Sequence, residues 1–138
     1  MRMHTNDTNV GNGKKLIYPE LSCLITGICF DIHNTLGRYC REKQYGDALA
    51  EKLGKLEISY KREFGIEETG NVVDFLIDDT IVVELKAKPI ILKDDYYQAQ
   101  RYLQALNKKL ALIINFRNRY LKPIRIIKID TAARNKFN

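Results

Sequence analysis

The chain has 138 residues, 45% of them hydrophobic and 29% charged, and this length and composition predict one compact soluble domain rather than two. No apolar run approaches the roughly 20 residues that span a bilayer, so we expect no membrane span and a cytoplasmic location. The net charge of +6 favours an anionic partner, although many basic proteins have none.

Cysteine and histidine contents argue against a zinc centre. The three cysteines, Cys23, Cys29 and Cys40, lack the paired spacing of metal ligands, and we expect them to be reduced packing residues. His4 and His33 are the only histidines, which is too few for a histidine-rich zinc site or a histidine-based nuclease. We expect His33 to pack or to cap a helix locally.

The first residues are predicted to form a leader without regular structure. Residues 1–15 are polar, rich in Asn and Gly, and show no periodicity, which is typical of disorder. We predict a single domain over residues 16–130 and a short tail over 131–138. The domain is expected to begin with a helix from Pro19 to about Gly37, because Pro suits a first turn and apolar residues then recur at helical spacing.

The rest of the predicted domain alternates strands and helices in the order ααβββαββ. The remaining elements are a helix over 41–53, strands over 57–64, 71–77 and 81–87, a helix over 93–106, and strands over 110–115 and 124–129. Short turns with Gly or Asp join the first three strands into an antiparallel meander. The helix that follows them predicts a right-handed parallel crossover, and hence a mixed central sheet flanked by helices.

Two predicted strands carry the most informative charged residues. Glu84 and Lys86 point to the same face of an otherwise apolar strand, because side chains alternate along a strand. A tight reversal brings the preceding strand alongside, and alternation places Asp74 there on the face of Val72 and Leu76. Asp74 and Glu84 are therefore expected to lie close together.

These residue types suit metal-dependent phosphodiester hydrolysis. We predict that Asp74 and Glu84 bind Mg²⁺ or Mn²⁺ through carboxylate oxygens, and that Lys86 lies near the attacking water and the scissile phosphate. Glu42, in the first turn of the second helix, is a third candidate carboxylate if that helix meets the sheet. The alternatives are a charge contact on a solvated edge strand for Glu84 and Lys86, and a helix-dipole interaction for Glu42.

Asp74, followed on the next strand by Glu84-Leu85-Lys86, resembles the signature of the PD-(D/E)XK nuclease superfamily, although no Pro precedes Asp74. Over about Leu21 to Asp130 the chain more closely resembles the GxxExxxY family of small bacterial proteins, with Tyr39 at a position where that family usually has Gly. The matching residues are Leu21-Ser22 through Gly27, His33-Asn34, Leu36-Gly37, Glu42, Tyr45, Ala48-Leu49, Val83-Glu84-Leu85-Lys86-Ala87, Gln98, Tyr102-Leu103 and Leu112-Ile113-Ile114-Asn115-Phe116. The resemblance implies a restriction-endonuclease-like α/β nuclease fold with no settled substrate, and fold and activity are separate claims.

Gln98 and Tyr102 resemble the Gln-x-x-x-Tyr element that follows the catalytic strand in RecB-like members of the superfamily, where the pair lines the site. At i and i+4 of a helix they share one face, and an amide and a phenol can orient a phosphate oxygen or a bound water. The alternative is that they only pack against strands.

Basic residues gather beside the predicted site. Arg41 and Lys43 flank Glu42, while Lys88 and Lys93 follow the site strand, and we predict that these four contact the phosphate backbone. Further basic residues lie near the C-terminus: Arg117, Arg119, Lys122 and Arg125. Solvated loops are the alternative interpretation.

The sequence thus predicts a nuclease that acts on nucleic acid, with DNA favoured over RNA. A nuclease-fold module of weak or no activity that binds nucleic acid or a protein is the second interpretation, and a purely structural interaction protein is the third. Small nucleases of this fold often cut as dimers, but no interface is evident in the sequence, so a homodimer stays open.

Overall fold

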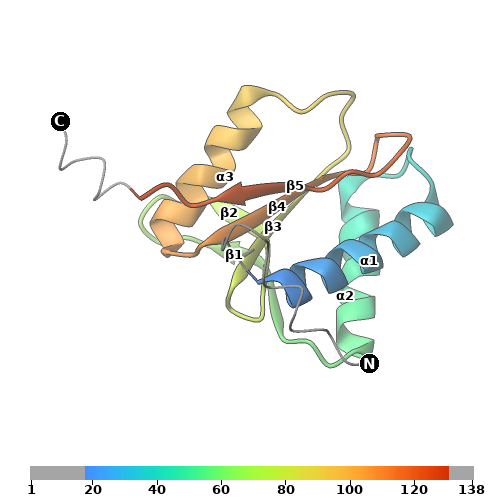
Figure 1. Cartoon of the computed structure of the whole chain (residues 1–138), viewed down its shortest axis with the longest axis horizontal. Coiled ribbons are helices and arrows are strands. Elements are labelled where there is room, and N and C mark those ends of the chain that lie inside the picture. The colour runs from blue at the N-terminus through green and yellow to red at the C-terminus, as the bar shows by residue number, and fades with distance from the viewer. Residues whose placement is uncertain (1–17, 131–138) are drawn as a thin grey trace, which may run out of the picture.

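The computed structural model describes residues 18–130, so the predicted leader over 1–15 and the predicted tail over 131–138 lie outside the described residues. The elements are α1 (Pro19–Leu36), α2 (Glu42–Lys55), β1 (Tyr60–Gly65), β2 (Val72–Ile77), β3 (Ile81–Lys86), α3 (Lys93–Leu106), β4 (Leu110–Asn115) and β5 (Ile124–Ile127). This is the predicted order ααβββαββ (Figure 1). The predicted α/β fold with a mixed sheet is confirmed.

The sheet has five strands in the order β1-β2-β3-β4-β5. The pairs β1–β2, β2–β3 and β4–β5 are antiparallel, whereas β3 and β4 run parallel because α3 carries the chain back between them. All six residues of β4 are buried, as expected for a strand that is covered on both faces. The C-terminal ends of β3 and β4 therefore lie together at one end of the sheet.

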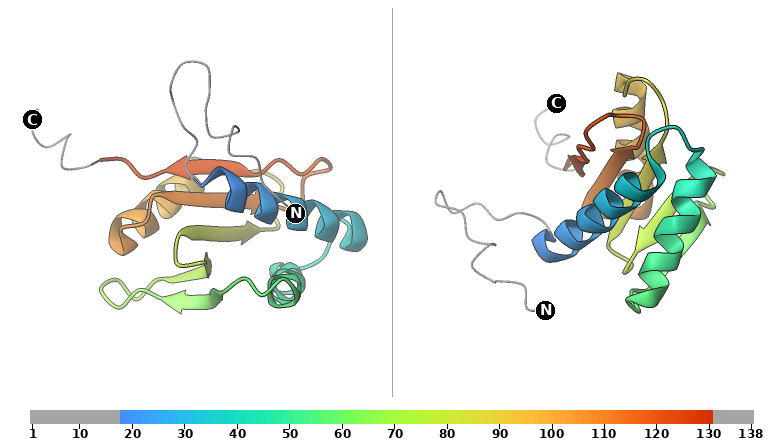
Figure 2. Two further views of the ribbon diagram at one scale, coloured as in Figure 1. Left: turned by 60° about the horizontal axis from the view of Figure 1, so that its bottom comes forward. Right: turned by 90° about the vertical axis from the view of Figure 1, so that its right-hand side faces the viewer.

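Helices α1 and α2 cover one face of the sheet and α3 covers the other (Figure 2, right). On β3 the two cores alternate, with Val83 facing α1 and α2 while Val82 faces α3. Helix α1 contributes its apolar stripe to the first core, including the fully buried Ile25. Gly37, at φ 80°, ends this helix in the left-handed region that glycine adopts readily.

Helix α2 extends slightly beyond its predicted end. The helix was predicted over 41–53, so that it would end before Gly54, but α2 continues to Lys55, and Leu56 N–H still bonds to the carbonyl of Lys52 at 3.1 Å. Leu53 is fully buried in the core under α1 and α2. This packing holds the last turn in place despite the lower helix propensity of glycine.

Candidate active site

The site begins where β2 and β3 separate. Their backbone pairing stops at Phe75 and Val83, so the next opposed pair, Asp74 and Glu84, makes no ladder contact. The two carboxylates replace the missing bonds: Asp74 N–H donates to Glu84 Oε2 at 2.8 Å, and Leu85 N–H donates to Asp74 Oδ2 at 2.8 Å. Each acid is thereby fixed by a neighbouring backbone amide, with one carboxylate oxygen engaged.

Side chains along β2 do not alternate regularly between the two faces of the sheet, and the irregularity lies at Asp74. Val73 packs in the core under α3, while Phe75, two residues on, packs in the core under α1 and α2. Opposite this step Glu63 adopts φ 50°, a left-handed conformation that is uncommon for glutamate. Asp74 consequently does not follow the alternation that the sequence predicts, and its side chain lines a cleft beside Phe75 and Leu85.

Burial makes both carboxylates hard to ionise. Glu84 is 4% exposed, and its desolvation, reinforced by the charge of Asp74, raises its pKa to about 8. The pKa of the half-buried Asp74 is also raised, chiefly by burial and in addition by the charge of Glu42, although the Leu85 N–H opposes the shift. Two carboxylates that repel each other away from water favour a bound cation or a shared proton.

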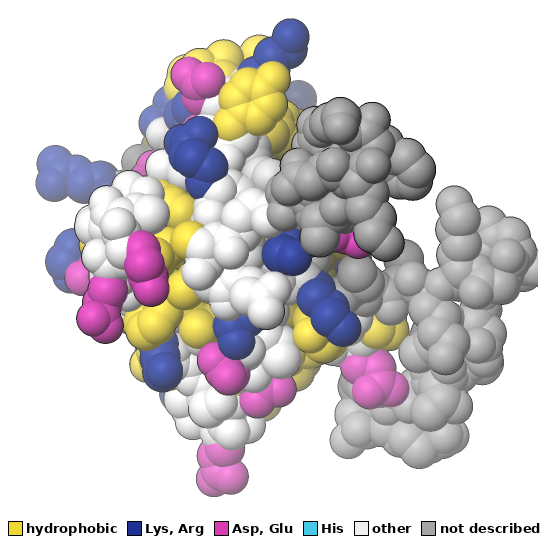
Figure 3. Space-filling model, turned by 90° about the vertical axis from the view of Figure 1, so that its left-hand side faces the viewer, with side chains coloured by type: hydrophobic (Ala, Val, Ile, Leu, Met, Phe, Trp, Pro, Cys, Tyr) yellow, Lys and Arg dark blue, Asp and Glu magenta, His cyan; other side chains and the backbone are white. Residues whose placement is uncertain are grey.

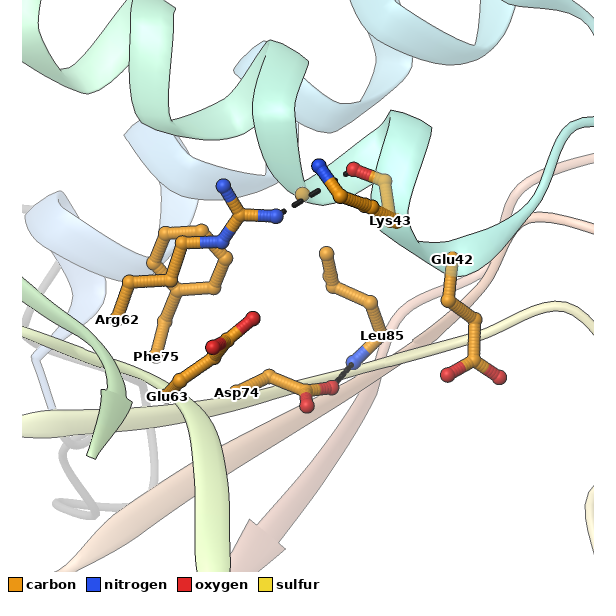
Figure 4. Close-up of a pocket in the computed structure, with 8 residues that line it drawn as sticks. Glu42, Lys43, Arg62, Glu63, Asp74, Phe75 and Leu85 are labelled. Carbon is orange, nitrogen blue, oxygen red and sulfur yellow. Dashed lines mark hydrogen bonds between the residues drawn. The ribbon is translucent and has the colours of Figure 1, made fainter. Parts of the chain in front are cut away.

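A cleft of about 220 Å³ opens over Asp74. Glu42, Glu63 and Asp74 line this space from the first turn of α2, from β1 and from β2 (Figure 4). Glu63 was not among the predicted site residues, and its position opposite Asp74 follows from the register of β1 and β2, which pairs Arg62 with Phe75 and Phe64 with Val73. We call Glu42, Glu63, Asp74 and Glu84 the acidic site.

Arg62 joins α2 to the sheet along one wall of the cleft. Its guanidinium pairs with Asp47 at 2.7 Å, donates to the carbonyl of Lys43 at 3.4 Å, and lies 5.6 Å from the ring centroid of Phe75. Gly46 makes this approach possible, because a Cβ there would lie 2.5 Å from Arg62 Nη2. The wall that carries Glu42 is thus held against β1.

Lys86 points toward α3 rather than toward the cleft. Its Nζ donates to Gln98 Oε1 at 3.0 Å and lies 3.7 Å from Asp95 Oδ1. Asp95, which sequence reasoning missed, also accepts hydrogen bonds from Lys88 Nζ and from Leu92 N–H, both at 2.8 Å. Burial raises the pKa of Asp95, but these donors and the positive charges outweigh it and leave the pKa below its ordinary value.

The Gln-x-x-x-Tyr pair lies on the site side of α3. Gln98 holds Lys86, as described, and Tyr102 is 4% exposed within the core under α3. Burial raises the pKa of Tyr102, and the negative charge of Glu84 raises it further. Both residues therefore adjoin the charged end of β3.

The four predicted phosphate contacts have different environments. Lys43 lines the cleft and forms an exposed pair with Asp47 at 3.3 Å. Lys88 is bound to Asp95. Arg41 and Lys93 are exposed, the first immediately before α2 and the second at the start of α3.

The acidic site suits a small hard cation. Among residues 18–130, no cluster of three or more His, Cys, Asp or Glu side chains has the geometry of a closed metal site. Mg²⁺ does not require one, since it commonly binds one or two carboxylates and completes its shell with water and substrate phosphate. Asp74 and Glu84, each with one oxygen held by an amide, fit that description.

A five-stranded mixed sheet between three helices, with acids at the point where two central strands diverge, defines a restriction-endonuclease-like nuclease fold. A family model described as the PD-(D/E)XK nuclease superfamily matches residues 19–127, and the chain belongs to this superfamily. No curated protein and no solved structure matches the chain. Within the described residues, no helix has the length and hydropathy to cross a membrane.

Proposed function

We propose that this protein is a divalent-metal-dependent nuclease that hydrolyses phosphodiester bonds in nucleic acid, with DNA favoured over RNA. The observation that carries the proposal is the reciprocal contact between Asp74 and Glu84, in which each carboxylate takes the place of a ladder hydrogen bond. Membership of the superfamily supports it, since PD-(D/E)XK nucleases generally use divalent metal ions.

Asp74 and Glu84 would hold the ion. Asp74 Oδ2 and Glu84 Oε2 already accept backbone N–H donors, which fixes the two side chains and leaves the second oxygen of each for a cation. Glu42 and Glu63 add negative charge at the cleft. They would contact the metal ion either directly or through bound water. Mg²⁺ or Mn²⁺ bound there would polarise the scissile phosphate and increase the acidity of a bound water.

Lys86 supplies the positive charge next to the reacting groups. An ammonium has three donors, and in this structure Lys86 Nζ donates to Gln98 and lies 3.7 Å from Asp95 Oδ1. In the proposed reaction the ammonium would turn from Asp95 toward the attacking water or a phosphate oxygen. Gln98 positions Lys86, and Tyr102 closes the site beside Glu84. In the reaction the water oxygen bonds to phosphorus, the P–O bond to the leaving sugar breaks, and the leaving oxygen takes a proton.

The test is cleavage of single- and double-stranded DNA and RNA by purified protein in Mg²⁺, Mn²⁺ or chelator. Asp74→Asn and Glu84→Gln retain the shape of each side chain and an oxygen that can accept the backbone hydrogen bond, while Glu51→Gln removes an exposed charge on α2 as the matched control. Metal-dependent cleavage that survives Glu51→Gln and disappears in the other two variants supports the proposal. Equal cleavage in all four proteins would indicate a contaminant.

A second function is favoured by one observation. Lys86 is held by Gln98 and lies close to Asp95, an arrangement that also suits a nuclease-fold module that binds nucleic acid with little turnover. Such a module predicts binding in chelator that Asp74→Asn leaves unchanged, and no metal-dependent product. Folded wild-type protein that binds but does not cut any of the substrates would favour this function.

A further inference from the structure

Three loops meet at the C-terminal ends of the parallel strands β3 and β4. They are the α1–α2 loop, the β3–α3 loop and the β4–β5 loop, and the right-hand view of Figure 2 looks onto this end. A depression of about 450 Å³ lies between them. Its lining consists of Arg38, Tyr39, Pro89, Arg117, Asn118, Arg119 and Tyr120, and none of these residues is acidic.

Two tyrosines in this depression are unusually accessible. Tyr39 is 74% exposed and Tyr120 is 76% exposed, the highest values among the large hydrophobic side chains of the described residues. An aromatic ring left in water forgoes the burial that normally stabilises it. Ile90 and Leu92 of the β3–α3 loop are also exposed, at 64% and 50%, whereas Phe116 is buried in the core. The two tyrosine rings remain the most exposed of these side chains.

Each exposed ring is accompanied by arginine. The guanidinium carbons of Arg38 and Arg117 lie 5.1 Å and 5.6 Å from the centroid of the Tyr39 ring, and that of Arg119 lies 5.3 Å from the centroid of the Tyr120 ring. We call these five residues the arginine–tyrosine patch. Planar cations beside planar rings form a surface that matches both parts of a nucleotide, since phosphate pairs with guanidinium and a base stacks on a ring.

Backbone contacts position the patch although it is built from loops. Arg38 Nε donates to the carbonyl of Arg117 at 2.9 Å, which ties the first loop to the third, and Arg117 Nη2 donates to the carbonyl of Ala87 at 3.3 Å. Asn115 adds a second tie, because it accepts from Lys88 N–H at 3.1 Å and donates to the Lys88 carbonyl at 2.8 Å. These contacts hold the patch against Ala87 and Lys88, the two residues that directly follow Lys86 in the chain.

The other end of the molecule has a different surface. Figure 3 faces the end opposite these loops, and there Lys and Arg side chains alternate with Asp and Glu rather than gathering together. The net charge of +6 is thus accompanied by a local surface of arginine and tyrosine next to the acidic site. A nucleic-acid strand bound on this surface would lie close to Lys86.

We propose that the arginine–tyrosine patch binds single-stranded nucleic acid, with unpaired bases stacked on Tyr39 and Tyr120 and with phosphates bound by Arg38, Arg117 and Arg119. The proposal rests on the proposed nuclease function in that it assigns the substrate a single-stranded segment. Stacking requires an open base face, which a continuous duplex offers only at its ends. The patch therefore selects single strands, frayed ends or unpaired loops over intact duplex.

The test is the binding of a fluorescent oligothymidylate, followed by anisotropy in chelator so that no cleavage occurs, with a labelled hairpin duplex as comparison. Tyr39→Ala and Tyr120→Ala should each weaken binding of the single strand by roughly 5- to 100-fold, while Tyr39→Phe and Tyr120→Phe retain it. Tyr97→Ala on α3, which removes an exposed ring elsewhere, is the matched control and should bind like wild type. Thermal melting verifies that each variant is folded.

Salt dependence separates the arginines from the tyrosines. Arg119→Gln should reduce the slope of log affinity against log salt by about 0.7 for one lost phosphate contact, whereas the tyrosine variants should lower affinity with the slope unchanged. The proposal is overturned if folded wild type fails to bind the single strand, if duplex binds equally well, or if Tyr39→Ala and Tyr120→Ala bind like Tyr97→Ala. An acidic protein as the true partner would give the first of these results.

Failure of this proposal and failure of the nuclease function give different results. If wild type and Asp74→Asn bind the single strand equally and neither cuts it in metal, the nuclease function is wrong and the patch stands. If wild type cuts and the tyrosine variants bind and cut normally, the nuclease function stands and the patch assignment is wrong.

Discussion

The acidic site and the arginine–tyrosine patch lie at the same end of the sheet but are built in opposite ways. Asp74 and Glu84 lie on strands, each is held by a backbone amide at 2.8 Å, and Glu84 is 4% exposed. Tyr39 and Tyr120 lie on loops and are about three-quarters exposed. Reactive groups need fixed positions, whereas groups that receive a polymer need access. Under the two proposals, the strands would hold the reactive groups and the loops would receive the nucleic acid.

The largest effect is expected from variants that change the acidic site and leave the arginine–tyrosine patch intact. Asp74→Asn or Glu84→Gln should lower the rate of metal-dependent cleavage by at least about 100-fold, because a bound metal ion contributes several kcal/mol to the transition state and each 1.4 kcal/mol is a factor of ten. Single-strand binding in chelator should stay within about twofold of wild type, since neither residue belongs to the patch. A parallel loss of cleavage and binding would show that the two regions are not separate.

Lys86 lies between the acidic site and the arginine–tyrosine patch. Its substitution tests whether it contributes to catalysis or to substrate binding. If Lys86 acts as proposed, Lys86→Gln should reduce kcat about 10- to 100-fold through loss of the charge that would hold the attacking water, with a smaller change in KM. Steady-state kinetics on a single-stranded substrate measure both. Lys109→Gln, which removes an exposed lysine immediately before β4 at the other end of the sheet, is the control. A change in KM alone would assign Lys86 to substrate binding.

Glu84 also makes the stability of the metal-free protein depend on pH. Its pKa rises from an ordinary value of 4.5 to about 8 on folding, so the folded state binds the proton more tightly than the unfolded state, and stability falls as pH rises from about 4.5 to about 8. Glu84→Gln lacks this titration and should be more stable than wild type at neutral pH in chelator, on the order of 2 kcal/mol.

Thermal melting of both proteins across that pH range measures the difference, which should grow with pH. Addition of Mn²⁺ should stabilise wild type and leave Glu84→Gln unchanged. A constant difference at every pH would contradict the assignment of the buried charge to Glu84.

The smallest expected effect concerns Glu63, which faces the cleft from β1. Glu63→Gln should weaken Mn²⁺ binding by about 10-fold, at the low end of the range for a group that acts around a metal rather than as its main ligand. Calorimetry of Mn²⁺ binding checks this value against that of Asp74→Asn. A loss as large as that of Asp74→Asn would make Glu63 a principal ligand instead.

The sequence predicted the regular parts of the fold because they depend on local patterns. Helical spacing in α1, the apolar strand β3 and the short turn between β2 and β3 were sufficient for the element order and for the opposition of Asp74 and Glu84. The broken alternation at Asp74 was not predictable in the same way, since it depends on the left-handed conformation of Glu63 on the neighbouring strand. Local propensity does not encode such a pairing.

Contacts between distant segments account for the remaining differences. Lys86 was expected near the phosphate, and no local pattern indicated that Asp95 on α3 would lie close to its ammonium group. The arginine–tyrosine patch likewise depends on the contact of Arg38 with Arg117, which lie in separate loops. Arg117 and Arg119 were noted as basic residues, but their relation to Tyr39 and Tyr120 appears only in three dimensions.

The most direct test of this division is a calorimetric titration of Mn²⁺ into wild type, Asp74→Asn and Tyr39→Ala. We expect wild type and Tyr39→Ala to bind Mn²⁺ with the same affinity, because Asp74 and Glu84 are the proposed ligands, and we expect Asp74→Asn to bind it at least about 10-fold more weakly. Equal binding by all three proteins would place the ion elsewhere and would contradict the acidic site as the metal centre.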